Sequence, residues 1–571
     1  MTVKYPLVLV LILSVCIGLG SAAYQNLAPE PRPLTRYVPA GALLYLEAKD
    51  FSSLLAKWNN SPEQQRWKQS SNYEVFSQSR LFLRLKDARD QFVSAAGLPP
   101  DGDFTTEAIG TTTALALYDI GKLHFLYITK IPSAHSMQSL LWQTRAKFET
   151  RSAGGVTFYV RRDFQIEREV AFTINGDYLL LATREELLAG ALKLMAESKD
   201  RTIEAEPWWS QAVAAAGPAG DLRLVLNLEK IVPSPYFRSY WIQQNITEMK
   251  QYSAAVTDLF GSGDGYREER VLLKKTPSGG ASHDTGSAAV ADLLRLVPAD
   301  AGAYEARSNP SAEDCAGLLQ SKILAPQIQA PAARRTFAPQ LQLASGATGN
   351  SSDLETRIDK APVRDSIGND APSALKGLFQ KNRVQAILQV QNTDKDKDGV
   401  FVGIHSAIAL LGDDGWNETE VRAALAEFLR PELTAGKLGI GWQTMSAHQE
   451  LDGLRKLTIA VRGRYWVISD DPALMSTLLA NMDKKIVQEP AVFVAGFNHT
   501  RERENFARLS EFVDRQDVGR QGYWRTGQTP RFLSQNIASL SAAAAGIGAQ
   551  KIVFRDAGDK VLQTVTYERA D

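Results

Sequence analysis

Cysteine is almost absent from this sequence of 571 residues, which holds only Cys16 and Cys315. A chain cut after Ala23 by a signal peptidase would keep one thiol and could form no internal disulfide. Stability must therefore come from packed cores, and a chain with 44% hydrophobic residues can bury cores of substantial size. The length exceeds that of one ordinary domain, so two or more globular units are expected.

An excess of positive or negative charge is absent as well. The 64 Lys and Arg residues balance the 64 Asp and Glu residues. A neutral chain has no overall field that would attract nucleic acid or acidic lipid. We therefore expect a protein or an envelope polymer as the partner, no nucleic acid, and a membrane contact only through an uncleaved N-terminal segment.

The N-terminus carries a long hydrophobic run within MTVKYPLVLVLILSVCIGLGSAAYQ. One Lys precedes the apolar residues 7–20, and the small residues Ser21 and Ala23 are placed for cleavage, as in a secretory signal. An uncleaved anchor is the alternative, because residues 7–23 are barely long enough to span a bilayer. Residues 1–23 thus predict an extracytoplasmic protein that is periplasmic, secreted or anchored to the inner membrane.

Three pairs of similar segments occur in the same order in the two halves of the chain. The same order in both halves indicates an internal duplication. The pairs are VPAGALLY (38–45) with VPADAGAY (297–304), residues 169–195 with 456–482, and residues 244–246 with 535–537.

Composition suggests where the two copies begin and end. The polar stretch TPSGGASHDTGSA follows the first copy and resembles an interdomain linker, and residues 325–372 are rich in Pro, Ala, Ser, Gly and Asn without periodicity. The predicted organisation is a first repeat at 36–275, a linker at 276–291, and a second repeat at 292–571 with a low-complexity insertion at 325–372.

The segment 169–195 predicts a hairpin followed by a helix. Apolar residues alternate before and after Asn175 and Gly176, which we expect to supply the positive backbone angles of a tight turn. Thr183 and Glu186 then have the spacing of a capping box. The second copy repeats the pattern with Gly463 at the turn and Asp470 or Asp471 as the helix cap.

The predicted helices have matching apolar faces, Leu187, Leu188, Ala191, Leu192 and Met195 in one copy and Leu474, Met475, Leu478, Leu479 and Met482 in the other. Each half therefore predicts an α+β domain, in which an antiparallel meander sheet has helices packed on one face.

The exported N-terminus, the Val38-Pro39-Ala40 opening before a strand and the turns at Gly176 and Gly463 resemble a group of uncharacterised bacterial cell-envelope proteins defined by a domain of unknown function. This resemblance covers most of residues 36–571. It implies a location in the envelope and brings no catalytic residues with it.

A possible calcium loop lies at DKDKDG, where Asp394, Asp396, Asp398 and Gly399 match the first, third, fifth and sixth positions of a helix-loop-helix site. His405 occupies the twelfth position, where such loops carry a bidentate Glu. The flanking segments predict strands, so a charged hairpin tip is the alternative, and any bound calcium would be held weakly.

Other motifs with chemical meaning are few. The six histidines, His124, His135, His283, His405, His448 and His499, include no pair at the i, i+4 spacing of helical metal ligands. Ser373 and Lys376 match Ser-x-x-Lys without the companion motifs of that enzyme class. Cys315 predicts a buried small side chain, and the sequence has no nucleophile elbow and no phosphate-binding loop.

Trp208 and Trp209 form the most prominent aromatic pair. We expect one ring to pack in the core and the other to cover an edge; the alternative is an exposed pair, which would suit a carbohydrate or protein ligand. The sequence predicts no catalytic residues and no cofactor beyond weak calcium. It favours an exported, non-enzymatic binding or scaffold protein of the bacterial envelope; a hydrolase of cell-wall or secreted polymer and a chaperone-like envelope protein are the alternatives.

Overall fold

The computed structural model describes residues 33–570 except 71–72, 74–75, 79, 100–106, 165–167, 235–248, 263–264, 277–282, 325–372, 396–401, 427–440, 452–455 and 506–543. The predicted signal segment, the insertion at 325–372 and the matching segments 244–246 and 535–537 lie outside the described residues. The chain divides into two compact units, unit 1 with residues 1–280 and 506–571 and unit 2 with residues 281–505.

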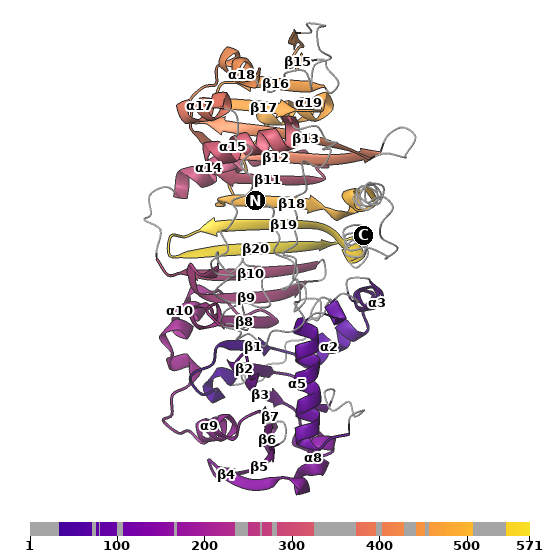
Figure 1. Ribbon diagram of the computed structural model, residues 1–571, viewed down its shortest axis with the longest axis vertical. Helices are drawn as coiled ribbons and strands as arrows, with labels where there is room; N and C mark the ends of the chain where they lie inside the picture. The colour runs from indigo at the N-terminus through magenta and orange to yellow at the C-terminus, as the bar shows by residue number, and fades with distance from the viewer. Residues whose placement is uncertain are drawn as a thin grey trace, which may run out of the picture. The chain divides into compact units, whose positions relative to one another are not determined.

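Unit 1 contains an antiparallel sheet with the strand order β4-β5-β6-β7-β3-β2-β1-β8-β9-β10-β20-β19. Its strands can be followed by their labels in Figure 1. The strands are β1 (Leu44–Ala48), β2 (Thr113–Asp119), β3 (His124–Lys130), β4 (Glu149–Ala153), β5 (Val156–Asp163), β6 (Arg168–Asn175), β7 (Tyr178–Ala182), β8 (Leu222–Asn227), β9 (Tyr252–Ser262), β10 (Gly265–Lys274), β19 (Ile547–Asp556) and β20 (Lys560–Arg569).

The helices of unit 1 connect these strands and border the sheet. They are η1 (Leu34–Tyr37), α2 (Phe51–Asn59), α3 (Pro62–Gln69), α5 (Arg80–Ala96), α7 (Ser133–Ser136), α8 (Leu140–Gln143), η2 (Thr144–Lys147), α9 (Glu185–Met195), η3 (Ile203–Ala205), α10 (Pro207–Ala215), α11 (Leu228–Ile231) and η6 (Ala544–Gly546).

Unit 2 contains an antiparallel sheet with the strand order β14-β15-β16-β17-β13-β12-β11-β18. Its strands are β11 (Ala303–Ser308), β12 (Val384–Lys395), β13 (Val402–Gly412), β14 (Gln443–Thr444), β15 (Gln449–Leu451), β16 (Leu457–Arg462), β17 (Tyr465–Ser469) and β18 (Phe493–Asn498). Its helices are α14 (His283–Leu294), α15 (Ala312–Leu319), η4 (Gln320–Leu324), α17 (Ser373–Lys381), α18 (Glu418–Leu425), α19 (Pro472–Ala480) and η5 (Asn481–Asp483).

The two strand orders correspond. In the sheet of unit 2, strands β14 to β18 have the positions that β4 to β8 have in unit 1, and β11 to β13 have the positions of β1 to β3. Tyr45 and Tyr304, which the sequence matches, are each the second residue of the first strand in their unit. The mixed α+β architecture is therefore as expected.

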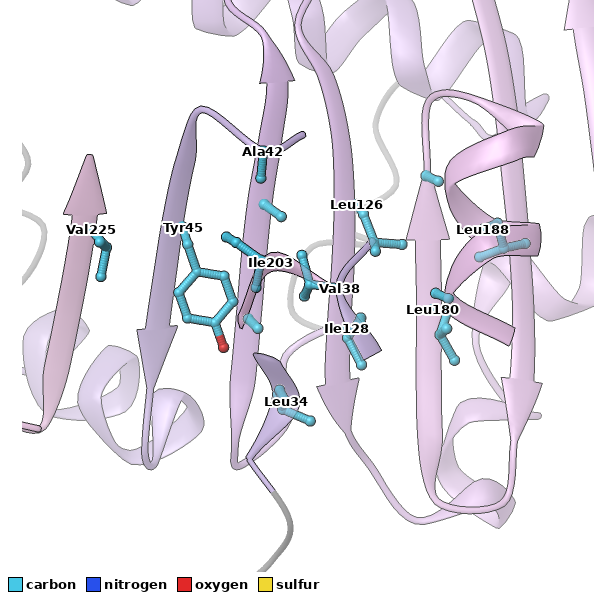
Figure 2. Packing of buried hydrophobic residues seen from close by; sticks show 14 of the residues in the cluster. Leu34, Val38, Ala42, Tyr45, Leu126, Ile128, Leu180, Leu188, Ile203 and Val225 are labelled. Atoms are coloured by element: carbon cyan, nitrogen blue, oxygen red, sulfur yellow. The ribbon is translucent and has the colours of Figure 1, made fainter. Parts of the chain in front are cut away.

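Helices cover both faces of the unit 1 sheet, whereas the sequence pattern predicted one covered face. On one face, Ala171 of β6 and Leu180 of β7 pack with α9. On the other face, their neighbours Phe172 and Leu179 pack with Phe92 of α5. The prediction was wrong because successive residues of β6 and β7 are apolar on both sides, so each face needs its own cover. Figure 2 shows the first of these cores, including Leu180 and Leu188.

The hairpin and helix that the sequence predicted differ only in detail. Gly176 has φ 56° and Gly463 has φ 57°, the left-handed backbone that favours glycine, while Asn175 ends β6 without such an angle. Asp471 caps α19 as expected. Thr183 does not cap α9, because its hydroxyl oxygen accepts a hydrogen bond from the backbone N–H of Phe125 in β3 instead.

Candidate functional site

A line of polar side chains crosses three neighbouring strands of unit 1 on the face covered by α10. Glu47 of β1 stands opposite Arg223 of β8, which stands opposite Asp258 of β9. Residues opposite one another in an antiparallel pair share one face of the sheet. We call Glu47, Arg223 and Asp258 the polar row.

Arg223 and Asp258 form a buried ion pair with two parallel hydrogen bonds. The distances are 2.8 Å from Nε to Oδ1 and 2.8 Å from Nη2 to Oδ2. Arg223 also donates to the carbonyl of Gly217, and Asp258 accepts from the backbone N–H of Gly220. The pair therefore fixes the loop that follows α10 against the sheet.

Glu47 is less fully satisfied than its neighbours. Its carboxylate accepts a hydrogen bond of 3.0 Å from the hydroxyl of Tyr45, which is fully buried. Burial raises the pKa of the Glu47 carboxyl above its ordinary value, and the Tyr45 hydrogen bond and the charge of Arg223 oppose this shift without cancelling it. Burial and the nearby Glu47 also raise the pKa of Tyr45.

Aromatic rings continue from Tyr45 towards the surface. The ring of Trp209 lies edge-on to that of Tyr45 with centroids 5.1 Å apart, and Trp208 lies edge-on to Trp209 at 5.8 Å. Trp209 is buried and Trp208 is half-buried. Figure 2 shows Tyr45 between Val225 and Ile203 in this core. The predicted tryptophan pair thus lies at the outer end of a continuous line that ends at Glu47.

Glu206 holds the indole of Trp208 in place. Its carboxylate accepts a hydrogen bond of 2.7 Å from Trp208 Nε1 and another of 3.0 Å from the backbone N–H of Gly41. Fixed rings and nearby carboxylates are the groups that binding sites use to orient a polar ligand. A ligand at Trp208 and Trp209 stays a prediction.

Sequence reasoning missed the polar row. A signal for one member was present, because Tyr45 and Glu47 alternate along a strand and must share a face, which places a carboxylate beside a core ring. Its partners could not be inferred, since β8 and β9 lie far along the chain and nothing local in the sequence pairs them with β1.

The matching positions of unit 2 are apolar. Ala306 stands two residues after Tyr304, as Glu47 stands two residues after Tyr45, and it pairs with Val494 of β18. Val494 thus takes the place of Arg223. The row belongs to one unit only, so this sheet position does not require polar side chains.

The predicted calcium loop is only partly described. Asp394 is the last but one residue of β12 and forms an ion pair of 3.1 Å with Arg501. Asp396 and Asp398 lie outside the described residues. Both flanking segments are strands, with His405 in β13. Within the described part of the chain, no group of three or more His, Cys, Asp or Glu side chains could hold a metal ion. Calcium binding stays a prediction.

Cys315 lies in α15 and is fully buried in the core of unit 2. Burial raises the pKa of its thiol to about 12, which keeps it protonated and unreactive at neutral pH. Across the ranges that the structure describes, no helix has the length and apolar character needed to cross a membrane.

No family model matches the chain, and no curated protein matches it. Among solved structures, crystal form I of TP0453, a Treponema protein, is similar at 13% identity and a TM-score of 0.23, covering 44% of this chain and 82% of that chain. Crystal form IV gives 12% identity, a TM-score of 0.23, and coverage of 42% and 79%. At this TM-score, no property of TP0453 is transferred to this chain.

Proposed function

We propose that this chain is an exported, duplicated α+β protein that binds a glycan polymer of the bacterial envelope at Trp208, at the outer end of the line formed by Trp209, Tyr45 and Glu47. Export is supported by residues 1–23, whose charged start, apolar run and small residues have the pattern of a secretory signal. The proposed activity is binding, without chemical turnover.

The duplication is supported by the matching order of the strands of unit 2 and strands β1 to β8 of unit 1, and by the register between β10 and β20. Gly265, the first residue of β10, pairs with Glu568, the last but one of β20. Lys560, the first residue of β20, pairs in the same way with Leu273, the last but one of β10. β10 and β20, the last strands of the two proposed copies, thus lie side by side in a symmetric register.

The observation that carries the binding proposal is the difference between the units at one sheet position. Unit 1 has a half-buried Glu47 and a buried Arg223 where unit 2 has Ala306 and Val494. A partly buried carboxyl with a raised pKa costs stability. Such groups are retained mainly where they act on a ligand.

A glycan fits the groups at the outer end of the line. The apolar faces of sugar rings stack on indole rings, and sugar hydroxyls donate hydrogen bonds to carboxylates. Trp208 supplies a half-buried ring whose orientation is fixed by the carboxylate of Glu206. A neutral chain also suits an uncharged polymer better than nucleic acid.

Co-sedimentation with insoluble, protease-treated envelope polymer tests the proposal. We expect the folded wild-type chain to sediment with the polymer, Trp208→Ala to lose at least tenfold in affinity, and Trp208→Phe to retain most of it because a ring remains. Protease treatment removes bound proteins, so binding that depends on untreated polymer would indicate a protein partner and contradict the glycan. Release of soluble sugars would indicate a hydrolase instead.

A further inference from the structure

A second polar line distinguishes the units, and it lies in unit 2. Glu450 of β15 pairs with Thr458 of β16, which pairs with Ser469 at the end of β17. In unit 1, Val160 pairs with Ala171, which pairs with Ala182 at the end of β7. The three polar positions of unit 2 therefore correspond to three apolar positions of unit 1.

His448 extends this difference. It stands two residues before Glu450, in the turn that joins β14 to β15, whereas Val160, the counterpart of Glu450, is preceded by Phe158 inside β5. Phe158 and Val160 are 1% and 2% exposed in the core beneath α9. The fold thus accepts an apolar residue at the position of Glu450, and a glutamate is not needed there to form the sheet.

The imidazole of His448 is buried without hydrogen bonds. Its side chain is 10% exposed and that of Glu450 is 11% exposed. Neither Nδ1 nor Nε2 of His448 has a hydrogen-bond partner among the residues that the structure describes. Burying an imidazole in this way costs free energy that a bound ligand can recover.

The remaining groups of this line are already engaged. Thr458 donates to the carbonyl of Ser469, and the hydroxyl of Ser469 bonds to the carbonyl of Ser406. Glu450 Oε1 lies 3.3 Å from Lys456 Nζ. Among the described residues of this line, the facing atoms of His448 and Glu450 are therefore the ones that can act together on a ligand.

The separation of these facing atoms suits a metal ion. His448 Nε2 lies 3.8 Å from Glu450 Oε2, which is too long for a hydrogen bond. Two ligand atoms bonded to one zinc ion at 2.0–2.1 Å with a tetrahedral angle lie about 3.3 Å apart. The observed distance exceeds this value by about half an ångström, a gap that a small side-chain rotation closes.

We propose that His448 and Glu450 bind a divalent transition-metal ion of the zinc type, with His448 Nε2 and Glu450 Oε2 as ligands and water completing the coordination. Imidazole with a carboxylate is a donor set that zinc accepts, whereas calcium takes oxygen ligands only. The Lys456 ammonium on the outer oxygen of Glu450 supports the carboxylate in the orientation that ligation requires, as partners of metal-bound carboxylates do.

The test is a titration of the full chain, without an affinity tag, with Zn²⁺ and separately with Ca²⁺, followed by calorimetry and by thermal unfolding. We expect one bound Zn²⁺ that raises the unfolding midpoint and no matching effect of Ca²⁺. The double variant His448→Phe with Glu450→Val removes both proposed ligands and places at position 450 the valine that unit 1 has at the corresponding position, so it should fold and lose this zinc ion.

Two further variants complete the test. Glu450→Gln keeps the side-chain size and removes the charge, and should weaken Zn²⁺ binding at least tenfold. His135→Ala removes an exposed histidine of unit 1 and should change nothing. Zinc binding of equal stoichiometry and affinity in the folded double variant or in Glu450→Gln, or no zinc binding by the folded wild-type chain, would overturn the proposal.

Discussion

Glu47 is a carboxylate in surroundings that disfavour its charge. It lies beside a core tyrosine, burial raises its pKa from the ordinary value of 4.5, and Ala306 takes the corresponding position in the other unit. Single side chains of this kind could be suspected from sequence, because Tyr45 and Glu47 alternate on one strand. The completed row could not, since Arg223 and Asp258 reach it only through long-range pairing.

The raised pKa of Glu47 predicts a pH-dependent stability. Below the ordinary carboxyl pKa the group is protonated in both states and avoids the cost of burying its charge, and this advantage is lost as the pH rises through the raised folded-state value. The free energy of unfolding of the wild type relative to Glu47→Gln should therefore fall between pH 4 and pH 8, as measured by urea unfolding at each pH. A difference in the free energy of unfolding that stays the same at every pH would contradict the conclusion that burial raises the pKa of Glu47.

The ion pair between Arg223 and Asp258 predicts a large stability loss when one partner is removed. Asp258→Ala leaves a buried guanidinium without its carboxylate, and should lower the free energy of unfolding by about 3–5 kcal/mol. Glu420→Ala is the matched control, because its pair with Lys381 is exposed and should contribute less than about 1 kcal/mol. Equal losses in urea unfolding would show that burial is not the deciding factor.

The hairpin and helix elements are where sequence reasoning worked best. Gly176 and Gly463 turn as expected, and Leu188, Ala191 and Leu192 are fully buried as predicted. These features depend on the local backbone and on helical periodicity, which neighbouring residues determine. The cap of α9 was missed because Thr183 bonds to a strand that lies elsewhere in the sequence.

The two turn glycines predict equal costs on substitution. At Gly176 and Gly463 an added Cβ meets no atom within 4 Å, so only the left-handed backbone angle resists a side chain. Gly176→Ala and Gly463→Ala should each destabilise by about 1 kcal/mol in thermal unfolding. Gly317→Ala is the control, since Gly317 lies in α15 with open space and no positive φ, and the change should stabilise slightly.

Over the whole chain, the sequence indicated mixed α+β structure, which the structure shows. The duplication into two similar halves stays a proposal. The sequence could not show that strands from the end of the chain join the sheet of unit 1. The hairpin of β19 and β20 comes last in the chain, yet it pairs with β10 in unit 1. Hydrophobic periodicity identifies such strands but carries no information about which edge they join.

This pairing predicts the effect of deleting residues 544–571. Removal of β19 and β20 leaves β10, a strand of ten residues, as an open edge. Open edges of this length pair with other chains. We expect the shortened chain to self-associate, as measured by size-exclusion chromatography with light scattering. Removal of Ala570 and Asp571 alone should leave the oligomeric state of the chain unchanged.

The binding claim is tested most directly inside cells, by a photo-crosslinking amino acid placed at Gln211. This exposed residue lies one helical turn after Trp208 on α10 and so borders the proposed site without replacing its ring. The same probe at Lys122, exposed between β2 and β3, serves as the control. We predict that irradiation joins the chain to envelope glycan from position 211 and not from position 122. Equal yields from both positions, or no glycan adduct from either, would contradict the account.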